Sequence, residues 1–225
     1  MIDTEAVRTL NRDGVLMCSQ LGGTSVSDFD GYAELMKQAG EFADSDYVAN
    51  ETRAALSGQS RAGLKDWLVR RPCQSKEEPL ARFATSRNLT DTVASVIGPT
   101  IALLKAEFWY VVPWAGKGKQ WSQSWHRDPE SEHIIKVFLY CREVSNQAGP
   151  FEYVRGSHAD LFDLCPAGKY LEPSKYDQLD PVRPRTFPGP AGTLVLANTA
   201  GLHRGGYGTE PRVTAVMTYL RKVAA

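Results

Sequence analysis

Two segments of the sequence carry residues that could bind a metal ion. His126 and Asp128 are separated by one residue, so in an extended segment their side chains would project to the same side and could grip one ion. An H-x-D pair alone is a weak signal, because such short patterns arise by chance. His203 supplies a third ligand, since it follows the strand-like run 193–197 and opens a glycine-rich turn, where a site at the rim of a barrel would lie.

The residue types of this set indicate a particular metal chemistry. Two imidazoles and one carboxylate form the facial ligand set used for iron(II) oxygen chemistry. Because the three ligands occupy one face of the ion, three coordination positions stay open for a cosubstrate and for dioxygen. We therefore predict an iron(II) site formed by His126, Asp128 and His203.

A basic residue beyond the third ligand could bind an anionic cosubstrate. Arg212 and Thr214 would share one face of a strand and could together receive a distal carboxylate. Arginine suits this task because its planar guanidinium donates two parallel hydrogen bonds to a carboxylate. A lone arginine after a proline is usually a solvated surface residue, so the prediction rests on its combination with the metal ligands.

Lys136 is a further candidate for binding an anion. It shares a predicted strand face with Phe138 and Tyr140, and an inward-pointing ammonium is costly unless it meets a carboxylate. We interpret Lys136 as a residue that helps to hold the cosubstrate or an anionic substrate. The alternative is a surface lysine whose alkyl chain covers apolar neighbours.

The remaining histidines are poorer metal ligands. His158 lies in a predicted turn after Arg155-Gly156-Ser157, and His133 lies in a polar loop, so a structural role is the better interpretation of both. A cluster of tryptophans precedes the ligand pair: Trp109, Trp114, Trp121 and Trp125. They could line a substrate pocket or fill the core and mouth of a barrel, and both interpretations stay open.

The first hundred residues are predicted to be mainly helical. Apolar residues in 28–42 recur three or four apart, which indicates a helix with one buried side. A second, short helix is predicted around Leu64, Trp67 and Leu68, ending at Pro72, and a third from a Thr90 cap to Gly98-Pro99. We expect these helices to support the part of the chain that carries the site.

From residue 101 the pattern changes to short apolar and aromatic runs divided by Gly, Pro, Asn and Ser, which is typical of consecutive strands. The predicted strands are 103–112, 134–140, 149–154, 193–197 and 212–220. Helices followed by many strands predict an α+β chain built on a sandwich or barrel. No repeat or long linker divides the 225 residues, so a single domain is expected, with residues 1–100 as helical support and 101–225 as the β core.

Composition excludes several classes of function. The 26 basic and 26 acidic residues give a formal net charge of zero, so no overall field would attract nucleic acid or anionic lipid. No apolar run approaches the length of a membrane span, and a cytoplasmic protein is expected. The four cysteines are far apart, without a C-x-x-C pair, so zinc-knuckle and thioredoxin-like sites are not expected. The short motifs of dinucleotide-binding, P-loop and serine-hydrolase proteins are also missing from the sequence.

The order of these segments resembles the phytanoyl-CoA dioxygenase-like (PhyH-like) branch of the iron(II)/2-oxoglutarate-dependent oxygenases. The resemblance covers about half of the chain and is carried by His126-Arg127-Asp128, the strand 136–140, the segment 149–158 with its Gly-Ser-His end, His203 and Arg212. It implies a double-stranded β-helix (a jelly-roll or cupin-like core), iron bound by His126, Asp128 and His203, and 2-oxoglutarate held by Arg212 with Thr214 as its hydroxyl partner. In that setting, Lys136 would also contact 2-oxoglutarate or the substrate.

The carboxylate at position 128 also bears on the reaction. Halogenating relatives replace this residue with a small one, so Asp128 favours hydroxylation of an unactivated C–H bond of a small metabolite, with release of succinate and CO2, over halogenation. A related hydrogen-abstraction outcome such as desaturation stays open. Two alternatives from other classes stay open. One is a β-barrel protein that binds metal without turnover, and the other is a cupin-like metalloenzyme that does not use 2-oxoglutarate.

Overall fold

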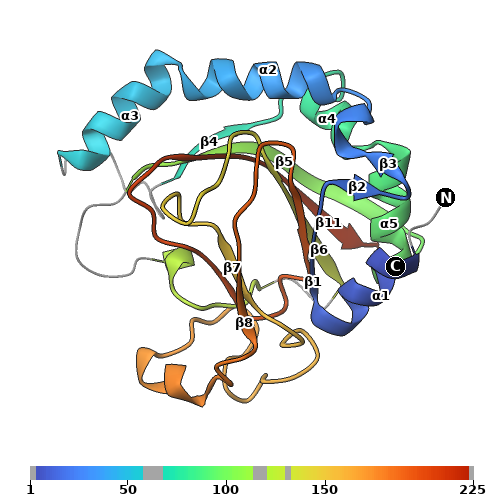
Figure 1. Ribbon diagram of the computed structural model, residues 1–225, viewed down its shortest axis with the longest axis vertical. Coiled ribbons are helices and arrows are strands. Elements are labelled where there is room, and N and C mark those ends of the chain that lie inside the picture. Colours follow the sequence, from blue (N-terminus) through green and yellow to red (C-terminus); the bar gives the residue numbers. More distant parts are fainter. Residues whose placement is uncertain (1–3, 58–67, 114–120, 130–132, 223–225) are drawn as a thin grey trace.

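A computed structural model describes residues 4–57, 68–113, 121–129 and 133–222. Helices gather in the first hundred residues and strands dominate the rest (Figure 1). The described helices are α1 (Thr4–Asp13), α2 (Tyr32–Ala43), α3 (Asp46–Leu56), α4 (Pro79–Ala84) and α5 (Arg87–Ile97), with 3-10 helices η1 (Val26–Asp28), η3 (Trp121–Gln123) and η4 (Pro173–Gln178).

The strands form two antiparallel sheets and a small hairpin. The larger, six-stranded sheet has the order β1 (Val15–Cys18), β9 (Leu194–Ala197), β6 (Ile134–Tyr140), β11 (Arg212–Arg221), β5 (Ile101–Val111), β4 (Leu68–Pro72). The smaller has the order β10 (His203–Gly205), β7 (Phe151–Val154), β8 (Pro184–Phe187), and β2 (Gln20–Leu21) pairs with β3 (Thr24–Ser25). The larger sheet takes both edge strands, β1 and β4, from the first hundred residues.

The two sheets pack against each other around an aromatic core. Phe138 and Tyr140 of the larger sheet share one buried cluster with Phe151 and Tyr153 of the smaller sheet. The ring centroids of Phe138 and Phe151 lie 4.7 Å apart. The predicted α+β chain with a double-stranded β-helix core is therefore confirmed.

Alternation along the central strands separates the helical layer from the interior of the barrel. In β6, Ile135, Val137 and Leu139 face the helices, whereas Lys136 and Phe138 face the space between the sheets. The same alternation holds in β11, which explains why the pairs 136/138 and 212/214 point inward together.

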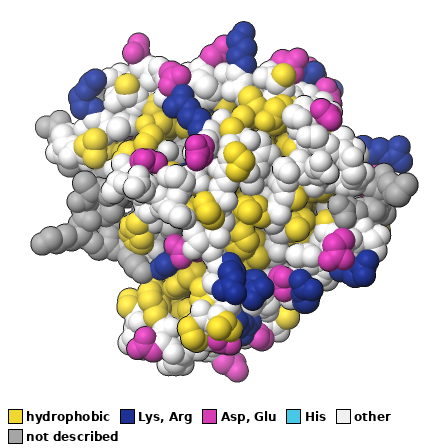
Figure 2. Space-filling view, viewed as in Figure 1, with side chains coloured by type: hydrophobic (Ala, Val, Ile, Leu, Met, Phe, Trp, Pro, Cys, Tyr) yellow, Lys and Arg dark blue, Asp and Glu magenta, His cyan; other side chains and the backbone are white. Residues whose placement is uncertain are grey.

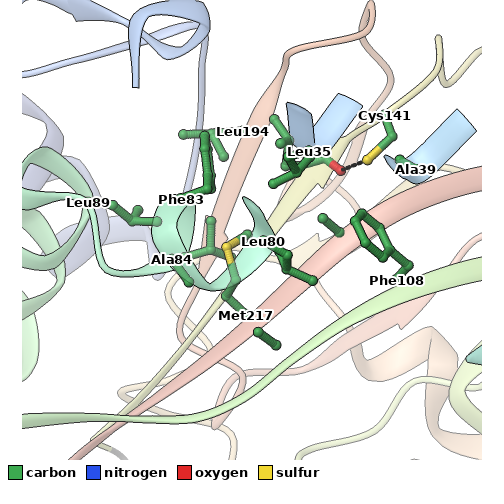
Figure 3. Close-up of a cluster of buried hydrophobic side chains, with 14 of the residues drawn as sticks. Leu35, Ala39, Leu80, Phe83, Ala84, Leu89, Phe108, Cys141, Leu194 and Met217 are labelled. Atoms are coloured by element: carbon green, nitrogen blue, oxygen red, sulfur yellow. Dashed lines mark hydrogen bonds between the residues drawn. The ribbon is translucent and has the colours of Figure 1, made fainter. Parts of the chain in front are cut away.

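The helices cover the outer face of the larger sheet. Figure 1 shows α2 and α3 running across this face, with α4 and α5 beside them. Figure 3 shows Leu80 and Ala84 of α4 beside Met217 of β11, and Leu35 of α2 belongs to the same buried cluster. Phe83 is fully buried and its ring packs 5.7 Å from that of Phe29.

Two of the predicted helices begin elsewhere. The helix expected over 28–42 starts only at Tyr32, because Gly31 adopts a left-handed φ of 76° and 3-10 helix η1 precedes it. The helix expected from a Thr90 cap begins at Arg87 and ends, as predicted, before Gly98. Thr90 does not cap it, because its hydroxyl donates back to the carbonyl of Ser86, 3.1 Å away.

The helix predicted around Leu64, Trp67 and Leu68 is wrong at Leu68, and the other two residues lie outside the described part of the chain. Leu68 opens strand β4, which pairs with β5 from Leu68 opposite Val111 to Pro72 opposite Glu107. Pairing with a long neighbouring strand outweighs the local helical spacing. The described elements that were not predicted also include helices α1, α3 and α4 and strands β1, β2, β3, β8 and β10.

The described surface has no extended field of one sign on the face that Figure 2 shows, where acidic and basic side chains are interspersed among patches of hydrophobic ones. This pattern agrees with the zero net charge of the sequence. None of the described helices has the length and apolar character needed to cross a membrane.

Candidate active site

The backbone itself brings the three predicted metal ligands together. His126 and His203 form an antiparallel bridge in which each amide donates to the other's carbonyl, at 3.0 Å in both directions. The amide of Asp128 donates to the carbonyl of Thr199, at 3.0 Å. The segment that holds the first two ligands is therefore locked against the loop that leads into β10, whose first residue is the third ligand.

Hydrogen bonds fix the tautomer of both histidines. The Nδ1 atom of His126 lies 2.9 Å from the carbonyl oxygen of Ser124, and the Nδ1 atom of His203 lies 2.9 Å from that of Gly201. Since a carbonyl only accepts, each Nδ1 carries the proton and each Nε2 keeps its lone pair. Both lone pairs are therefore available to a metal ion, a device that metal-binding histidines commonly use.

The three side chains converge on one point. The Nε2 atoms of His126 and His203 lie 3.9 Å and 3.7 Å from the nearer carboxylate oxygens of Asp128. One ligand atom from each residue lies within 4.8 Å of the others, and Asp128 and His203 are buried. Such a group could hold a metal ion on one face and leave its other face open.

The charges of the site suit a divalent cation. Burial, together with neighbouring His126, lowers the pKa of His203 to about 3, so its imidazole is neutral at neutral pH. Burial by itself would raise the pKa of Asp128, but the ion pair with Lys136 and hydrogen bonds to the carboxylate outweigh burial, and the pKa is lowered. Both ligands are thus in the protonation state that metal binding requires.

Lys136 makes a close ion pair with one of the metal-ligand candidates. Its Nζ atom lies 2.6 Å from Oδ2 of Asp128. The expected contact of an inward ammonium with a carboxylate is therefore present, and the carboxylate belongs to the protein. A contact of Lys136 with a cosubstrate stays a prediction.

Arg212 and Thr214 lie on the inner face of β11 and line the same cavity as the three ligands. The Nη1 atom of Arg212 is buried and has no hydrogen-bond partner among the described residues. Burial lowers the pKa of this guanidinium, which still keeps its charge because arginine does not lose its proton in proteins. Gly205 allows this position, since a Cβ atom there would come within 3.3 Å of Nη2 of Arg212.

The cavity over the three ligands has a volume of about 380 Å³. Aromatic residues form much of its wall, and Ser122 and Gln123 add polar groups on one side. Its described lining also includes Leu68, Arg70, Trp109, Val111, Phe138, Tyr140, Phe151 and Tyr170. A mostly apolar cavity with a few convergent polar groups is typical of small-molecule sites.

The two tryptophans near the site whose side chains the structure describes have different roles, one in the cavity wall and one in the core. Trp109 lines the cavity, and its ring packs edge-on against Phe138 at 6.3 Å. Trp125 is buried in a separate hydrophobic cluster and is covered by the guanidinium of Arg204, 4.5 Å from its ring. The side chains of Trp114 and Trp121 lie outside the described part of the structure.

The other two histidines do not join the site. Nε2 of His158 lies 3.2 Å from the carbonyl oxygen of Asn11, and burial lowers its pKa. His133 lies directly before β6, where its carbonyl accepts a hydrogen bond from the amide of Arg221. Neither belongs to the group of potential metal ligands found among the described residues.

Arg127, between the first two ligands, is a structural residue for which the sequence predicted no role. It is 1% exposed and its guanidinium donates to the carbonyl oxygens of Cys165 at 2.5 Å, Ser157 at 2.8 Å and Asp160 at 2.6 Å, and also to that of Ala200. Because residues alternate in extended backbone, a side chain between two inward ligands points away from the metal site, into the loops behind it. This alternation was the sequence signal that could have predicted a structural role for Arg127.

Several solved structures are similar to this protein in fold. No protein-family model matches the sequence, and no curated protein matches it. EctD from S. alaskensis in its apo form is similar in structure, with a TM-score of 0.69 and 19% identity over 98% of this chain and 77% of that chain. The epimerase SnoN, in complex with Fe3+, alpha-ketoglutarate and nogalamycin RO, has a TM-score of 0.62 and 18% identity over 96% of this chain and 82% of that one.

A third similar structure is the non-heme monooxygenase ThoJ, with a TM-score of 0.60 and 18% identity over 96% of this chain and 77% of that chain. EctD has also been solved with bound Fe and with 2-oxoglutarate and 5-hydroxyectoine. At these identities the likeness establishes the fold. The chain therefore has the double-stranded β-helix fold found in non-heme iron and 2-oxoglutarate-dependent enzymes.

Proposed function

We propose that this chain is an Fe(II)- and 2-oxoglutarate-dependent oxygenase, with His126, Asp128 and His203 as iron ligands. The observation that carries the proposal is the buried group of two Nε2 lone pairs and one carboxylate, all within 4.8 Å. Nitrogen and oxygen donors of this kind fit iron(II), and a three-residue set leaves positions for 2-oxoglutarate and dioxygen. When bound, the iron would use 2-oxoglutarate and dioxygen to oxidise a C–H bond, with succinate and CO2 as coproducts.

Arg212 would receive the distal carboxylate of 2-oxoglutarate. Its buried Nη1 atom has no partner within the described residues, and leaving a buried charged donor unpaired is costly, so an anion in this part of the cavity fits. Thr214, on the same face two residues along β11, is 2% exposed and would add its hydroxyl. The carboxylate would thus be oriented by two side chains of one rigid strand.

The walls of the cavity would position the substrate and exclude water. Trp109, Phe138 and Phe151 surround the ligands with apolar surface, which favours a dry site and strengthens its electrostatic interactions. Asp128 occupies the position that halogenating relatives leave open, so hydroxylation of a small metabolite is the proposed outcome. The proposal covers the whole chain as one domain and assigns it to the PhyH-like branch, on the resemblance of the sequence.

Succinate formation tests the proposal. With Fe(II), 2-oxoglutarate and dioxygen supplied, the wild-type protein is expected to form succinate, whereas His126→Ala and Asp128→Ala are expected to form none above the protein-free background. His133→Ala removes a histidine outside the ligand group and is the matched control. Undiminished succinate formation in Asp128→Ala would contradict the proposed iron site.

The alternative is a cupin-like metal-binding protein or metalloenzyme that does not use 2-oxoglutarate. It predicts metal binding by the same three residues, no consumption of 2-oxoglutarate and no effect of Arg212→Ala on the metal-dependent activity. The buried Nη1 atom of Arg212, which has no hydrogen-bond partner among the described residues, favours the oxygenase, because an anionic cosubstrate would give this atom an acceptor.

A further inference from the structure

Lys136 is a basic residue in a place where a basic residue is costly. It lies in the middle of β6, and its side chain is only 17% exposed. Its neighbours on the strand, Ile135 and Val137, pack under the helices, so Lys136 projects to the opposite side, into the cavity. A partly buried ammonium needs a nearby anion or hydrogen-bond acceptors.

The anion that Lys136 meets is the carboxylate of Asp128. The Nζ–Oδ2 distance is 2.6 Å, and the side chain of Asp128 is 10% exposed. The same carboxylate faces both histidines, with Oδ1 3.9 Å from Nε2 of His126 and Oδ2 3.7 Å from Nε2 of His203. The carboxylate of Asp128 is therefore paired with the ammonium of Lys136 and is also one of the three candidate metal ligands.

Another carboxylate near Lys136 is already engaged. Glu107 lines a smaller cavity of about 90 Å³ to which Lys136 also contributes. Its Oε2 atom accepts a hydrogen bond from Nε1 of Trp109, at 2.7 Å. The close pair of Lys136 with Asp128 is thus a specific contact within the candidate metal site.

We propose that Lys136 is a positioning residue that holds Asp128 by one oxygen, so that the carboxylate can bind the metal only through the other. Two cations on one carboxylate bind opposite oxygens because they repel each other. The carboxylate then takes a single coordination position, and the position that a second oxygen would occupy stays open for the cosubstrate. This inference rests on the proposed metal site.

Metal binding without cosubstrate tests the role of Lys136. Lys136→Met keeps the length of the side chain and removes its charge, so Asp128 can close on the metal with both oxygens and without a competing cation. We expect this variant to bind Co(II), titrated against a competing chelator, about tenfold more tightly than wild type. Lys136→Arg, which keeps the charge, should bind Co(II) within a few-fold of wild type.

Thr218→Val is the matched control. Thr218 lies opposite Lys136 in the register of β6 and β11, and it lines the smaller cavity. Its substitution removes a polar group beside Lys136 without touching Asp128. The Co(II) affinity of this variant should equal that of wild type.

A second titration adds 2-oxoglutarate to the Co(II)-loaded protein and tests whether the coordination position beside Asp128 is open to this cosubstrate. Lys136→Met should need about tenfold more 2-oxoglutarate than wild type to reach half-saturation, because the second oxygen of Asp128 competes with it. A lysine that only contacts 2-oxoglutarate would lower cosubstrate affinity but leave Co(II) affinity unchanged. A lysine with a merely structural role would leave Co(II) affinity equal or weaker.

Equal or weaker Co(II) binding by folded Lys136→Met would therefore overturn the inference. If that variant does not fold, the neutral Lys136→Gln is subject to the same two titrations and the same criterion. If wild type binds no Co(II), the proposed metal site itself fails, which is a different result from a wild-type site that the lysine does not influence.

Discussion

At the scale of single residues, the site depends on keeping one histidine neutral and one aspartate charged in a buried place. His203 is 5% exposed and Asp128 is 7% exposed. The histidine is kept neutral chiefly by burial, and the aspartate is kept charged by Lys136 against the effect of burial. Both residues are thereby ready to bind a cation without first exchanging protons.

The pKa of His203 has a consequence for stability. It falls from an ordinary value of 6.5 to about 3 in the folded protein, so below pH 6.5 protons bind the unfolded chain preferentially. Stability should therefore fall as the pH falls, and His203 alone should cost about 2 kcal/mol of unfolding free energy between pH 7 and pH 5. The lowered pKa of Asp128 acts only at more acidic pH.

Urea unfolding of the metal-free protein at pH 7 and pH 5 measures this effect. His203→Leu has no titrating group at this position, so its unfolding free energy should change less between the two pH values, by about 2 kcal/mol. The same pH dependence in wild type and variant would show that His203 is protonated in the folded state.

At the scale of elements, two ligand-bearing segments are held together by a buried arginine. Arg127 donates to carbonyls of the loop that follows β7 and, through Ala200, to the loop that leads to His203. Its guanidinium also lies 4.2 Å from the ring of Phe162. The metal ligands on either side of Arg127 are therefore anchored from behind.

Arg127→Met should destabilise the protein strongly, by on the order of 3 kcal/mol or more, because several buried carbonyls lose their donors. Arg142→Met is the control, since Arg142 pairs with Asp44 in an ion pair whose side chains are 44% and 72% exposed. Its loss should cost less than about 1 kcal/mol. Chemical denaturation of both variants gives the comparison, and similar small losses would contradict the anchoring role of Arg127.

The sequence predicted the strands of the site better than the surrounding elements. The strand expected over 134–140 matches β6, because its short, nearly continuous apolar run and the polar loop before it are local signals. Leu68 was misassigned because its strand forms only by pairing with β5, a contact distant in sequence. The start of α2 depended on the left-handed backbone of Gly31, which periodicity alone does not reveal.

Among the site residues, too, the features with a local sequence pattern were predicted and those that depend on distant contacts were not. The pairs His126/Asp128 and Arg212/Thr214 followed from spacing on extended backbone, and the structure brings them to one cavity with His203. The ion pair between Lys136 and Asp128 could not be foreseen, because spacing shows that a lysine points inward but not which carboxylate it meets. The hydrogen bonds of the Arg127 guanidinium could not be foreseen either, because their acceptors are backbone carbonyls of loops, which have no sequence signature.

At the scale of the whole molecule, the helical layer and the site occupy opposite faces of the larger sheet. Leu139 and Met217 face the helices, while Phe138 and Val216 face the barrel interior. The helices therefore stabilise the sheet from outside, and the inner face of the sheet presents Lys136 and Arg212 to the cavity. Tyr219 joins these layers through a 2.6 Å hydrogen bond to the carbonyl of Ala84.

Phe83→Ala should lower the stability of the protein without changing its metal affinity. Removing this fully buried ring should cost about 3–5 kcal/mol of unfolding free energy. The metal affinity of the folded fraction should stay that of wild type, because the ring lies on the outer face of the sheet. Leu104→Ala, at a leucine 48% exposed, is a control expected to change stability by less than about 0.5 kcal/mol. A large loss of metal affinity in folded Phe83→Ala would contradict this expectation.

Anaerobic binding of Fe(II) and 2-oxoglutarate, followed by the weak visible charge-transfer absorption of the chelated cosubstrate, is the decisive test of the proposed site. The band should appear with wild type, and Arg212→Ala should need about a hundredfold more 2-oxoglutarate to produce it, because the distal carboxylate loses its partner. Arg142→Ala, a surface control, should behave as wild type. Iron binding without any band would contradict the oxygenase and favour a metal-binding protein that does not use 2-oxoglutarate.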